Sequence, residues 1–354
     1  MTAKFHSYIL NFKRPGGTSR GVLHTKETFI LEIFHGEKKG VGECGLFRGL
    51  SYDDLPEYEQ KLQWLCDNIN EDSGFLHQKL LHFPSIWFGY EQAILNLKNG
   101  GDIYFKSDFT VGKSSIKTNG LIWMGDAKFM QQQIQEKLDI GFDCIKLKIG
   151  VEWPTEKAIL TELRQKFTAD QLELRVDANG GFSFEEAKIV LQELAELEIH
   201  SIEQPIKPGS IVRGANNQQP STSTRQPSTN QQPMAELCAS TPTPVALDEE
   251  LIGIVDFEAK KELLDQIKPQ FIILKPSLVG GISGTDEWIA LAEERRVGWW
   301  ITSALESNIG LNAIAQYTFT KNPKIPQGLG TGGLFTNNFE TKLHLEGDRL
   351  FYKR

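Results

Sequence analysis

Cysteine is scarce in this chain of 354 residues. The four cysteines, Cys44, Cys66, Cys144 and Cys238, are scattered and form no CxxC pair, which argues against a disulfide framework. No apolar run approaches the roughly 18 residues of a membrane-spanning helix. The opening stretch MTAKFHSYILNFKRPGG lacks the apolar core and cleavage site of a signal peptide. These absences predict a cytoplasmic protein whose cysteines are reduced.

The chain also has no excess of basic residues over acidic ones. The formal net charge is −8, which argues against general binding to nucleic acid or to an anionic membrane surface. An anionic small molecule stays possible as a partner, because a metal ion and a few lysines can reverse the local field.

Several familiar catalytic motifs are absent as well. The histidines show no HExxH spacing and no G-x-S-x-G occurs, so zinc hydrolysis and serine hydrolysis lack support. GLGTGG, residues 328–333, matches G-x-G-x-x-G, but no following helix and βαβ unit is expected that would hold a dinucleotide. We expect these glycines to line the mouth of a site and to offer N–H groups to a substrate carboxylate.

From residue 116 onward the chain alternates short β-like runs with helical stretches. The helical stretch FEEAKIVLQELAELEI follows Ser183, which stands with Glu186 at capping-box spacing. This alternation indicates parallel βαβ units, and about 210 residues with close to eight units favour a (β/α)7β TIM-type barrel over a doubly wound sheet. The predicted strands are NGLIWM, CIKLKI, LELRVDA, HSIEQP, PVALDEE, FIILKP and GWWITSAL, with a weaker eighth near PQGLG.

The remaining parts of the chain have other patterns. Residues 1–115 predict a separate α+β domain with a β-hairpin at HGEKKG, and residues 334–354 are expected to pack back onto it. Residues 116–333 then form the barrel. Within it, residues 214–233 are almost devoid of apolar side chains and predict a flexible, low-complexity insertion. Whether it is an inert insertion or a polar contact surface stays open.

Polar residues recur at the ends of the predicted barrel strands, where barrel enzymes keep their catalytic groups. From Lys148 the successive gaps are 29, 26, 45, 27 and 28 residues, and removing the 20-residue insertion from the longest gap leaves 25. Lys146 shares a strand face with Lys148, and Arg175 and Asn179 share one with Asp177. The phased residues are Lys148, Asp177, Glu203, Asp248, Lys275 and Ser303, and Glu306 follows the last of them.

The phasing brings three carboxylates to the ends of three neighbouring strands. Such a cluster is unfavourable unless a cation neutralises it, and all-oxygen ligands suit Mg²⁺. Lys146 and Lys148 would then face a metal and an anionic substrate. Each residue alone has a plainer interpretation: the lysines as solvated groups on an edge strand, Asp177 as a helix cap or turn residue, and Asp248 as part of a solvated acidic turn.

With these residues in place, the chain resembles the muconate-lactonizing subgroup of the enolase superfamily. The resemblance rests on Lys-x-Lys on the second barrel strand, on Asp, Glu and Asp after the third, fourth and fifth strands, and on Lys after the sixth. It covers nearly the whole chain, because that family places an α+β capping domain before a (β/α)7β barrel. The implied chemistry is removal of a proton α to a carboxylate, with Mg²⁺ (or Mn²⁺ in its place) stabilising the enediolate.

The resemblance also implies a role for each residue. The metal ligands would be Asp177, Glu203 and Asp248, with Glu250 as the fallback for Asp248. Lys148 would be the base, Lys146 its support, and Lys275 the opposing acid/base or a stabilising cation. The expected substrate-binding residues are Arg175, Asn179, Ser303 and Glu306.

Within the subgroup, the similarity is greatest to the o-succinylbenzoate synthase family. TSRGVL (18–23) and GECGLFRGLSYDD (42–54) look like its capping loops, and ILKPSLVGG and SALES fit as well. The implied reaction is dehydration of a cyclohexadiene carboxylate that bears a succinyl chain. An N-acylamino acid racemase and a dipeptide epimerase are the alternatives, although the Asp-x-Asp typical of the epimerases is missing from GLGTGGLF. A barrel that binds a ligand without reacting is a third, and the oligomeric state is left undetermined.

Overall fold

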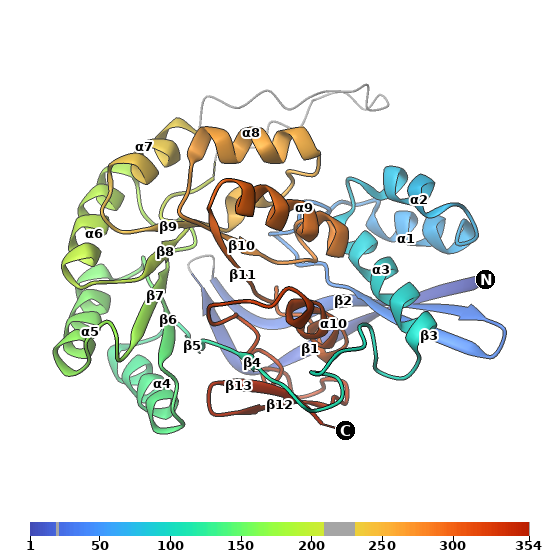
Figure 1. Ribbon diagram of the computed structural model, residues 1–354, viewed down its shortest axis with the longest axis horizontal. Coiled ribbons are helices and arrows are strands. Elements are labelled where there is room, and N and C mark those ends of the chain that lie inside the picture. Colours follow the sequence, from blue (N-terminus) through green and yellow to red (C-terminus); the bar gives the residue numbers. More distant parts are fainter. Residues whose placement is uncertain (19–20, 209–230, 354) are drawn as a thin grey trace.

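The structure is a computed structural model that describes residues 1–18, 21–208 and 231–353. It contains an N-terminal antiparallel unit beside a curved parallel sheet that carries helices on its outer side (Figure 1). Among the helices in the described residues, none combines the length and apolar character that a bilayer crossing requires.

The N-terminal unit is a three-stranded antiparallel sheet, in the order β1-β2-β3, covered by helices. The predicted hairpin at HGEKKG is present, because His35 pairs with Lys38 across the turn between β2 and β3. The elements are β1 (Thr2–Thr18), β2 (Gly21–His35), β3 (Lys38–Cys44), α1 (Tyr58–Asp67), α2 (Ser73–Leu80) and α3 (Pro84–Asn99).

A seven-stranded parallel sheet follows, in the order β11-β10-β9-β8-β7-β6-β5. Its strands are β5 (Gly120–Ile122), β6 (Cys144–Lys148), β7 (Glu173–Asp177), β8 (Ser201–Glu203), β9 (Val245–Leu247), β10 (Phe271–Leu274) and β11 (Gly298–Ile301). The helices are α4 (Ala127–Asp139), α5 (Trp153–Lys166), α6 (Phe184–Glu196), α7 (Gln232–Ser240), α8 (Phe257–Ile267), α9 (Gly281–Glu294) and α10 (Asn308–Thr320), with a 3-10 turn η1 (Glu249–Leu251) after β9.

The barrel closes through a two-residue link where the weak eighth strand was expected. Gln327 forms a parallel bridge with Thr118, and Gly328 forms one with Thr302. The Gln327 N–H donates to the Lys117 carbonyl at 2.9 Å, and the Gly328 N–H donates to the Ile301 carbonyl at 2.9 Å. The link therefore joins both edges of the sheet, and the Gly328 N–H is not available to a substrate carboxylate.

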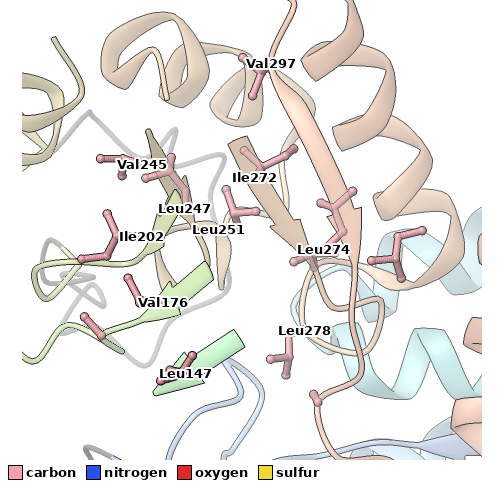
Figure 2. Close-up of a cluster of buried hydrophobic side chains, with 14 of the residues drawn as sticks. Leu147, Val176, Ile202, Val245, Leu247, Leu251, Ile272, Leu274, Leu278 and Val297 are labelled. Atoms are coloured by element: carbon pink, nitrogen blue, oxygen red, sulfur yellow. The ribbon is translucent and has the colours of Figure 1, made fainter. Parts of the chain in front are cut away.

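Apolar side chains on the outer face of the parallel sheet hold the helices against it. Leu147, Val176, Ile202, Leu247 and Ile272 come from five neighbouring strands and are all fully buried (Figure 2). Helix α6 begins as predicted, because the Ser183 side chain accepts from the Glu186 N–H and the Glu186 side chain accepts from the Ser183 N–H.

The C-terminal segment joins two parts of the molecule. Phe335 forms an antiparallel bridge with Phe12 of β1, so this stretch lies against the N-terminal sheet. The last strands, β12 (Leu343–Glu346) and β13 (Arg349–Tyr352), form a separate small sheet with β4 (Ile116–Lys117). The domain limits drawn from the sequence stay a prediction.

The sequence patterns missed some elements. The long strand β1 and the helix α2 were not predicted. Helix α7 begins at Gln232, so the last two residues of the predicted insertion 214–233 are helical rather than flexible. Most of the insertion lies outside the described residues.

Candidate active site at the mouth of the barrel

The two lysines of β6 point into the barrel. This strand lies between β5 and β7, so it is not an edge strand. Ile145 and Leu147 are fully buried in the core cluster that includes the surrounding helices, whereas Lys146 and Lys148 alternate with them and are each only 9% exposed. The interpretation of Lys146 and Lys148 as solvated edge-strand residues is therefore wrong.

Parallel register places the first carboxylates beside these lysines. Lys148 pairs with Asp177 across β6 and β7, and Asp177 pairs with Glu203 across β7 and β8. The Lys146 Nζ lies 2.6 Å from Glu203 Oε2 and 3.3 Å from Asp177 Oδ2. The Lys148 Nζ donates to Asp177 Oδ2 at 2.9 Å and to Asn179 Oδ1 at 2.7 Å. Side chains from three adjacent strand ends thus meet at one point.

The next two strands add a second charged pair. Asp248 directly follows β9, Lys275 directly follows β10, and the Lys275 Nζ donates to Asp248 Oδ2 at 2.5 Å. The neighbouring Glu250 carboxylate instead accepts from Gln204 Nε2 at 3.2 Å. Of the two predicted alternatives for the third ligand, Asp248 is thus the one that accepts from Lys275.

Burial and mutual attraction shift the pKa values of these groups. Burial favours neutral Asp177, but Lys148 and Lys146 outweigh it and hold the Asp177 pKa well below its usual range. Burial raises the pKa of Glu203 to about 8, although Lys146 opposes that effect. Burial disfavours the Lys146 ammonium, yet Glu203 and Asp177 together raise the pKa of Lys146 above its ordinary value. The carboxylates that face Lys146 therefore favour its charged form.

The three carboxylates suit a hard divalent cation. They supply only oxygen donors, and Glu203 Oε1 is buried with no hydrogen-bond partner among the described residues. In the part of the chain that the structure describes, no group of three His, Cys, Asp or Glu side chains already converges on one metal position. The carboxylates turn to the lysine ammonium groups instead, so a cation already neutralises each of them. The residues fit a divalent metal that would replace these ammonium contacts.

A cavity of about 80 Å³ opens beside these groups. Its lining combines charged and polar side chains with apolar ones, which suits a ligand that has both a carboxylate and a ring. The polar lining includes Lys146, Lys148, Asp177, Asn179, Lys275, Ser303 and Thr331, and the apolar lining includes Phe47, Leu50, Leu121, Trp123, Ala304 and Leu305. Phe47 and Leu50 come from the predicted capping stretch 42–54. Of the other predicted stretch, 18–23, residues 19 and 20 lie outside the described part.

Two of the predicted substrate-binding residues line this cavity. Asn179 accepts from Lys148 and also donates to Glu249 Oε1 at 3.1 Å, which fixes the side-chain amide. The Ser303 hydroxyl is 2.6 Å from the Thr331 hydroxyl. Both stand where a substrate would contact them, and their binding roles stay predictions.

The other two lie elsewhere. Arg175 is fully buried two residues before Asp177, deeper in the barrel, where its Nη1 donates to the Pro326 carbonyl at 3.0 Å and its guanidinium lies over the Trp300 ring. Glu306 is also fully buried, and its Oε1 accepts from the Ser277 hydroxyl at 2.5 Å. Neither residue is among those that line the cavity within the described chain.

The sequence patterns gave no role to Gln204. It is fully buried directly after Glu203, and its Oε1 accepts from the N–H groups of Asp248 and Glu250 at 3.2 and 3.1 Å. Gln204 therefore links the second and third predicted ligand positions. Its place next to Glu203, in EQP, was the available signal, but its partners lie 44 and 46 residues away.

Comparison with known proteins identifies proteins to which the chain is similar. The chain is 42% identical to an o-succinylbenzoate synthase of Desulfotalea psychrophila, over 99% of this chain and 98% of that protein. The crystal structure of MenC from the same organism has a TM-score of 0.83, 38% identity and 99% coverage of both chains. A dipeptide epimerase of Enterococcus faecalis, crystallised with Mg and L-Leu-L-Tyr, has a TM-score of 0.79 at 19% identity, over 100% of this chain and 96% of that one, and it shares the fold.

The predicted fold class, a TIM-type barrel with an N-terminal α+β capping domain, is confirmed by these matches. The family described as Enolase C-terminal domain-like matches residues 129–342, which is more than half of the chain. Members of this superfamily use a divalent metal ion. This chain belongs to that family and, through it, to the enolase superfamily.

Proposed function

We propose that this protein is an o-succinylbenzoate synthase, which removes water from 2-succinyl-6-hydroxy-2,4-cyclohexadiene-1-carboxylate to form 2-succinylbenzoate, the dehydration step of menaquinone biosynthesis. The observation that carries the proposal is the set of lysines and carboxylates on adjacent strand ends, beside a cavity that is also lined by apolar side chains. The 42% identity with an o-succinylbenzoate synthase over nearly the full length of both chains supports the specific reaction.

Lys148 is the proposed base. Its Nζ is held by Asp177 and Asn179 at the cavity wall, and it takes the proton from the ring carbon that bears the carboxylate. The bond between carbon and the hydroxyl oxygen then breaks, and Lys148 returns the proton to the departing hydroxide. Water and the aromatic product result, with no net oxidation. Aromatisation of the ring drives the reaction.

Lys275 faces the same cavity from β10, on a different strand from the base. There its ammonium would stabilise the negative charge that develops on the substrate. Phe47, Leu50 and Trp123 cover the ring and exclude water, which strengthens these electrostatic contacts.

The proposed ligands of the metal ion are Asp177, Glu203 and Asp248, and the proposed ion is Mg²⁺, with Mn²⁺ as a substitute. Carboxylate oxygens are the donors that these hard cations prefer. When bound, the ion would supply a positive charge that lowers the pKa of the proton next to the substrate carboxylate.

An adjoining cavity gives room for the succinyl chain. It measures about 390 Å³ and shares Leu121, Trp123 and Thr331 with the catalytic cavity. Lys13 and Arg14 are among its lining residues and suit a second carboxylate on the substrate.

N-acylamino acid racemisation is the second candidate, because Lys148 and Lys275 reach the cavity from two strands and could each exchange a proton with a carbon between them. The cytoplasm is the proposed location, a proposal supported by the four cysteines, which are all free and buried.

The test is turnover of the cyclohexadiene substrate with Mg²⁺, followed by the ultraviolet change as the ring aromatises. Lys148→Ala should lower kcat by at least about 100-fold, because general base catalysis is lost. Circular dichroism should show an intact fold. If the wild-type protein leaves this substrate unchanged but exchanges the α-proton of N-succinyl amino acids in deuterated water, the function is racemisation. Silence in both assays would indicate a barrel that only binds its ligand.

A further inference from the structure

Glu306 occupies a position that the proposed reaction does not explain. It lies in the loop between β11 and α10, directly after Ala304 and Leu305, which line the catalytic cavity. Its own carboxylate is fully buried and turns away from that cavity. One oxygen, Oε1, accepts from the Ser277 hydroxyl at 2.5 Å, and the other, Oε2, accepts from the Ala304 N–H at 2.7 Å. The side chain therefore joins two loops of the barrel mouth.

The second of these loops carries Lys275. Ser277 lies two residues beyond it, in a tight turn that the Lys275 carbonyl closes by accepting from the Leu278 N–H at 2.7 Å and the Val279 N–H at 3.1 Å. A displacement of Ser277 would thus be transmitted to the backbone of Lys275. Glu306 is the side chain that holds the Ser277 hydroxyl.

The loop that bears Glu306 needs outside support. Leu305 has a φ of 60°, a conformation that costs free energy in any residue with a β-carbon and persists only where the surroundings enforce it. The residue after Glu306 is held by Glu43 of the N-terminal sheet. Glu43 Oε1 accepts from the Ser307 N–H at 2.9 Å, and Oε2 accepts from the Ser307 hydroxyl at 2.5 Å and the Gly310 N–H at 2.9 Å.

The same N-terminal unit supplies a positive charge. Lys26 of β2 is 4% exposed, and its Nζ is buried with no hydrogen-bond partner among the described residues. Burial raises the pKa of Glu306, and the attraction of Lys26 opposes that effect. Gly45 passes so close that a methyl group there would lie 3.0 Å from the Glu306 Cγ. Glu306 is therefore enclosed by the N-terminal unit on one side and by the Lys275 turn on the other.

We propose that Glu306 is a positioning residue that fixes the Lys275 turn through Ser277, and that Glu43 and Lys26 of the N-terminal unit hold Glu306 in place. The unit that covers the cavity also determines the geometry of a catalytic lysine. The proposal rests on the proposed function for the role of Lys275, and it replaces the substrate contact predicted for Glu306 from the sequence.

The first experiment compares Glu306→Gln with Ser277→Ala. Each should lower kcat by about 10- to 100-fold, because small misplacements of a catalytic group have effects of this size, while KM and the affinity for Mg²⁺ stay unchanged. The double variant should be no slower than the slower single variant, since both remove one link. A rise in KM at constant kcat would mean that Glu306 contacts the substrate, as predicted from the sequence, and would overturn the proposal. Unchanged kinetics would overturn it as well.

Gln316→Ala is the matched control for stability. Gln316 lies in helix α10, which follows the Glu306 loop, and its Oε1 accepts from the Tyr104 N–H at 2.8 Å and the Phe105 N–H at 3.0 Å. Its loss should lower the free energy of unfolding by about 1–3 kcal/mol, because buried donors lose their acceptor, and should leave kcat unchanged. A fall in kcat in this variant equal to that of Glu306→Gln would mean that general loosening, not positioning, explains the effect.

A second readout needs no turnover. With ¹³Cε-labelled lysine, the NMR signal of Lys275, assigned with Lys275→Met, should shift in Glu306→Gln and in Lys26→Met. The Lys148 signal should stay in place, because its partners Asp177 and Asn179 are on another strand end. A Lys275 signal that does not move in the variants would overturn the proposal. If the signal moves in the variants but the wild-type protein does not dehydrate the substrate, only the proposed function is overturned.

Discussion

At the scale of single residues, the site is a balance between buried charges of opposite sign. Lys146 forms ion pairs with Asp177 and Glu203, and Lys275 forms one with Asp248. Each carboxylate that would hold a metal ion therefore already contacts an ammonium group. Removing one member of such a set leaves its partner buried and uncompensated, which is far more costly than losing a surface ion pair. Substitutions here should therefore be close in shape to the native residue.

Glu203→Gln keeps the side-chain shape and removes one negative charge. We expect the affinity for Mg²⁺ to fall by at least about tenfold, since changes even to groups behind the ligands have effects of that size. Isothermal titration of EDTA-treated protein with MgCl₂ measures it. Glu250→Gln is the control, because that carboxylate accepts from Gln204 Nε2. Loss of affinity in the control alone would reassign the metal ligands.

At the scale of elements, strand β3 and helix α3 pack with their backbones almost in contact. A methyl group on Gly42 would lie 2.0 Å from the Gly89 carbonyl oxygen, and one on Gly40 would lie 2.0 Å from the Ala93 carbonyl oxygen. Only glycine fits there without moving one element. The close approach places Glu43, the next residue on β3, against the first turn of α10.

Gly42→Ala should lower the free energy of unfolding by about 1–3 kcal/mol or more, as overpacking of a dense interior does. Urea denaturation followed by circular dichroism measures the change. Gly333→Ala is the control, because a methyl group there would have no atom within 4 Å. Equal stability of Gly42→Ala and the wild-type protein would show that β3 and α3 separate easily, contrary to the packing described above.

At the scale of the whole molecule, carboxylates of the N-terminal unit reach the beginnings of two barrel helices. Glu43 holds the first turn of α10, and Glu91 of α3 accepts from the Ile282 and Ser283 N–H groups of α9 at 2.6 and 3.0 Å. Negative groups are favoured at helix N-termini. The two units are thus held together by buried and partly buried polar contacts, so their docking should depend on pH.

The Glu91 contact determines whether the free energy of unfolding rises or falls with pH. Burial raises the pKa of Glu91 to about 7, from an ordinary value of 4.5, and nearby Asp286 adds to the rise. As the pH rises from about 4.5 to about 7, the unfolded chain releases this proton before the folded protein does, which favours unfolding. The wild-type protein should lose about 3 kcal/mol relative to Glu91→Gln over this range.

Urea denaturation of both proteins between pH 4 and pH 8 measures that difference. It should be constant below about pH 4.5 and again above about pH 7, since folded and unfolded states then carry the same charge on Glu91. If the free energy of unfolding of the wild-type protein instead rises with pH relative to that of Glu91→Gln, the helix N-terminus lowers the pKa of Glu91 and outweighs its burial.

The sequence by itself was sufficient to predict the barrel and the residues at its strand ends. Lys148, Asp177, Glu203, Asp248 and Lys275 could be found because each parallel strand and its helix repeat after a nearly constant length. Residues at equivalent strand ends then meet at one edge of the sheet. The alternation of Lys146 and Lys148 with apolar residues likewise predicted which side chains lie on the inner face of β6, because successive side chains of any strand point to opposite faces.

Only the tertiary structure decided which way the other polar side chains turn. Glu306 and Arg175 have the right spacing, yet Glu306 contacts Ser277, and Arg175 lies deeper in the barrel against Trp300. The sequence contains no local signal for these contacts, since the partners are 29 residues or more away and approach from other elements. The positions of Lys26 and Glu43 against the barrel are undetermined by sequence for the same reason, because a buried charge needs a compensating group that lies far away in the chain.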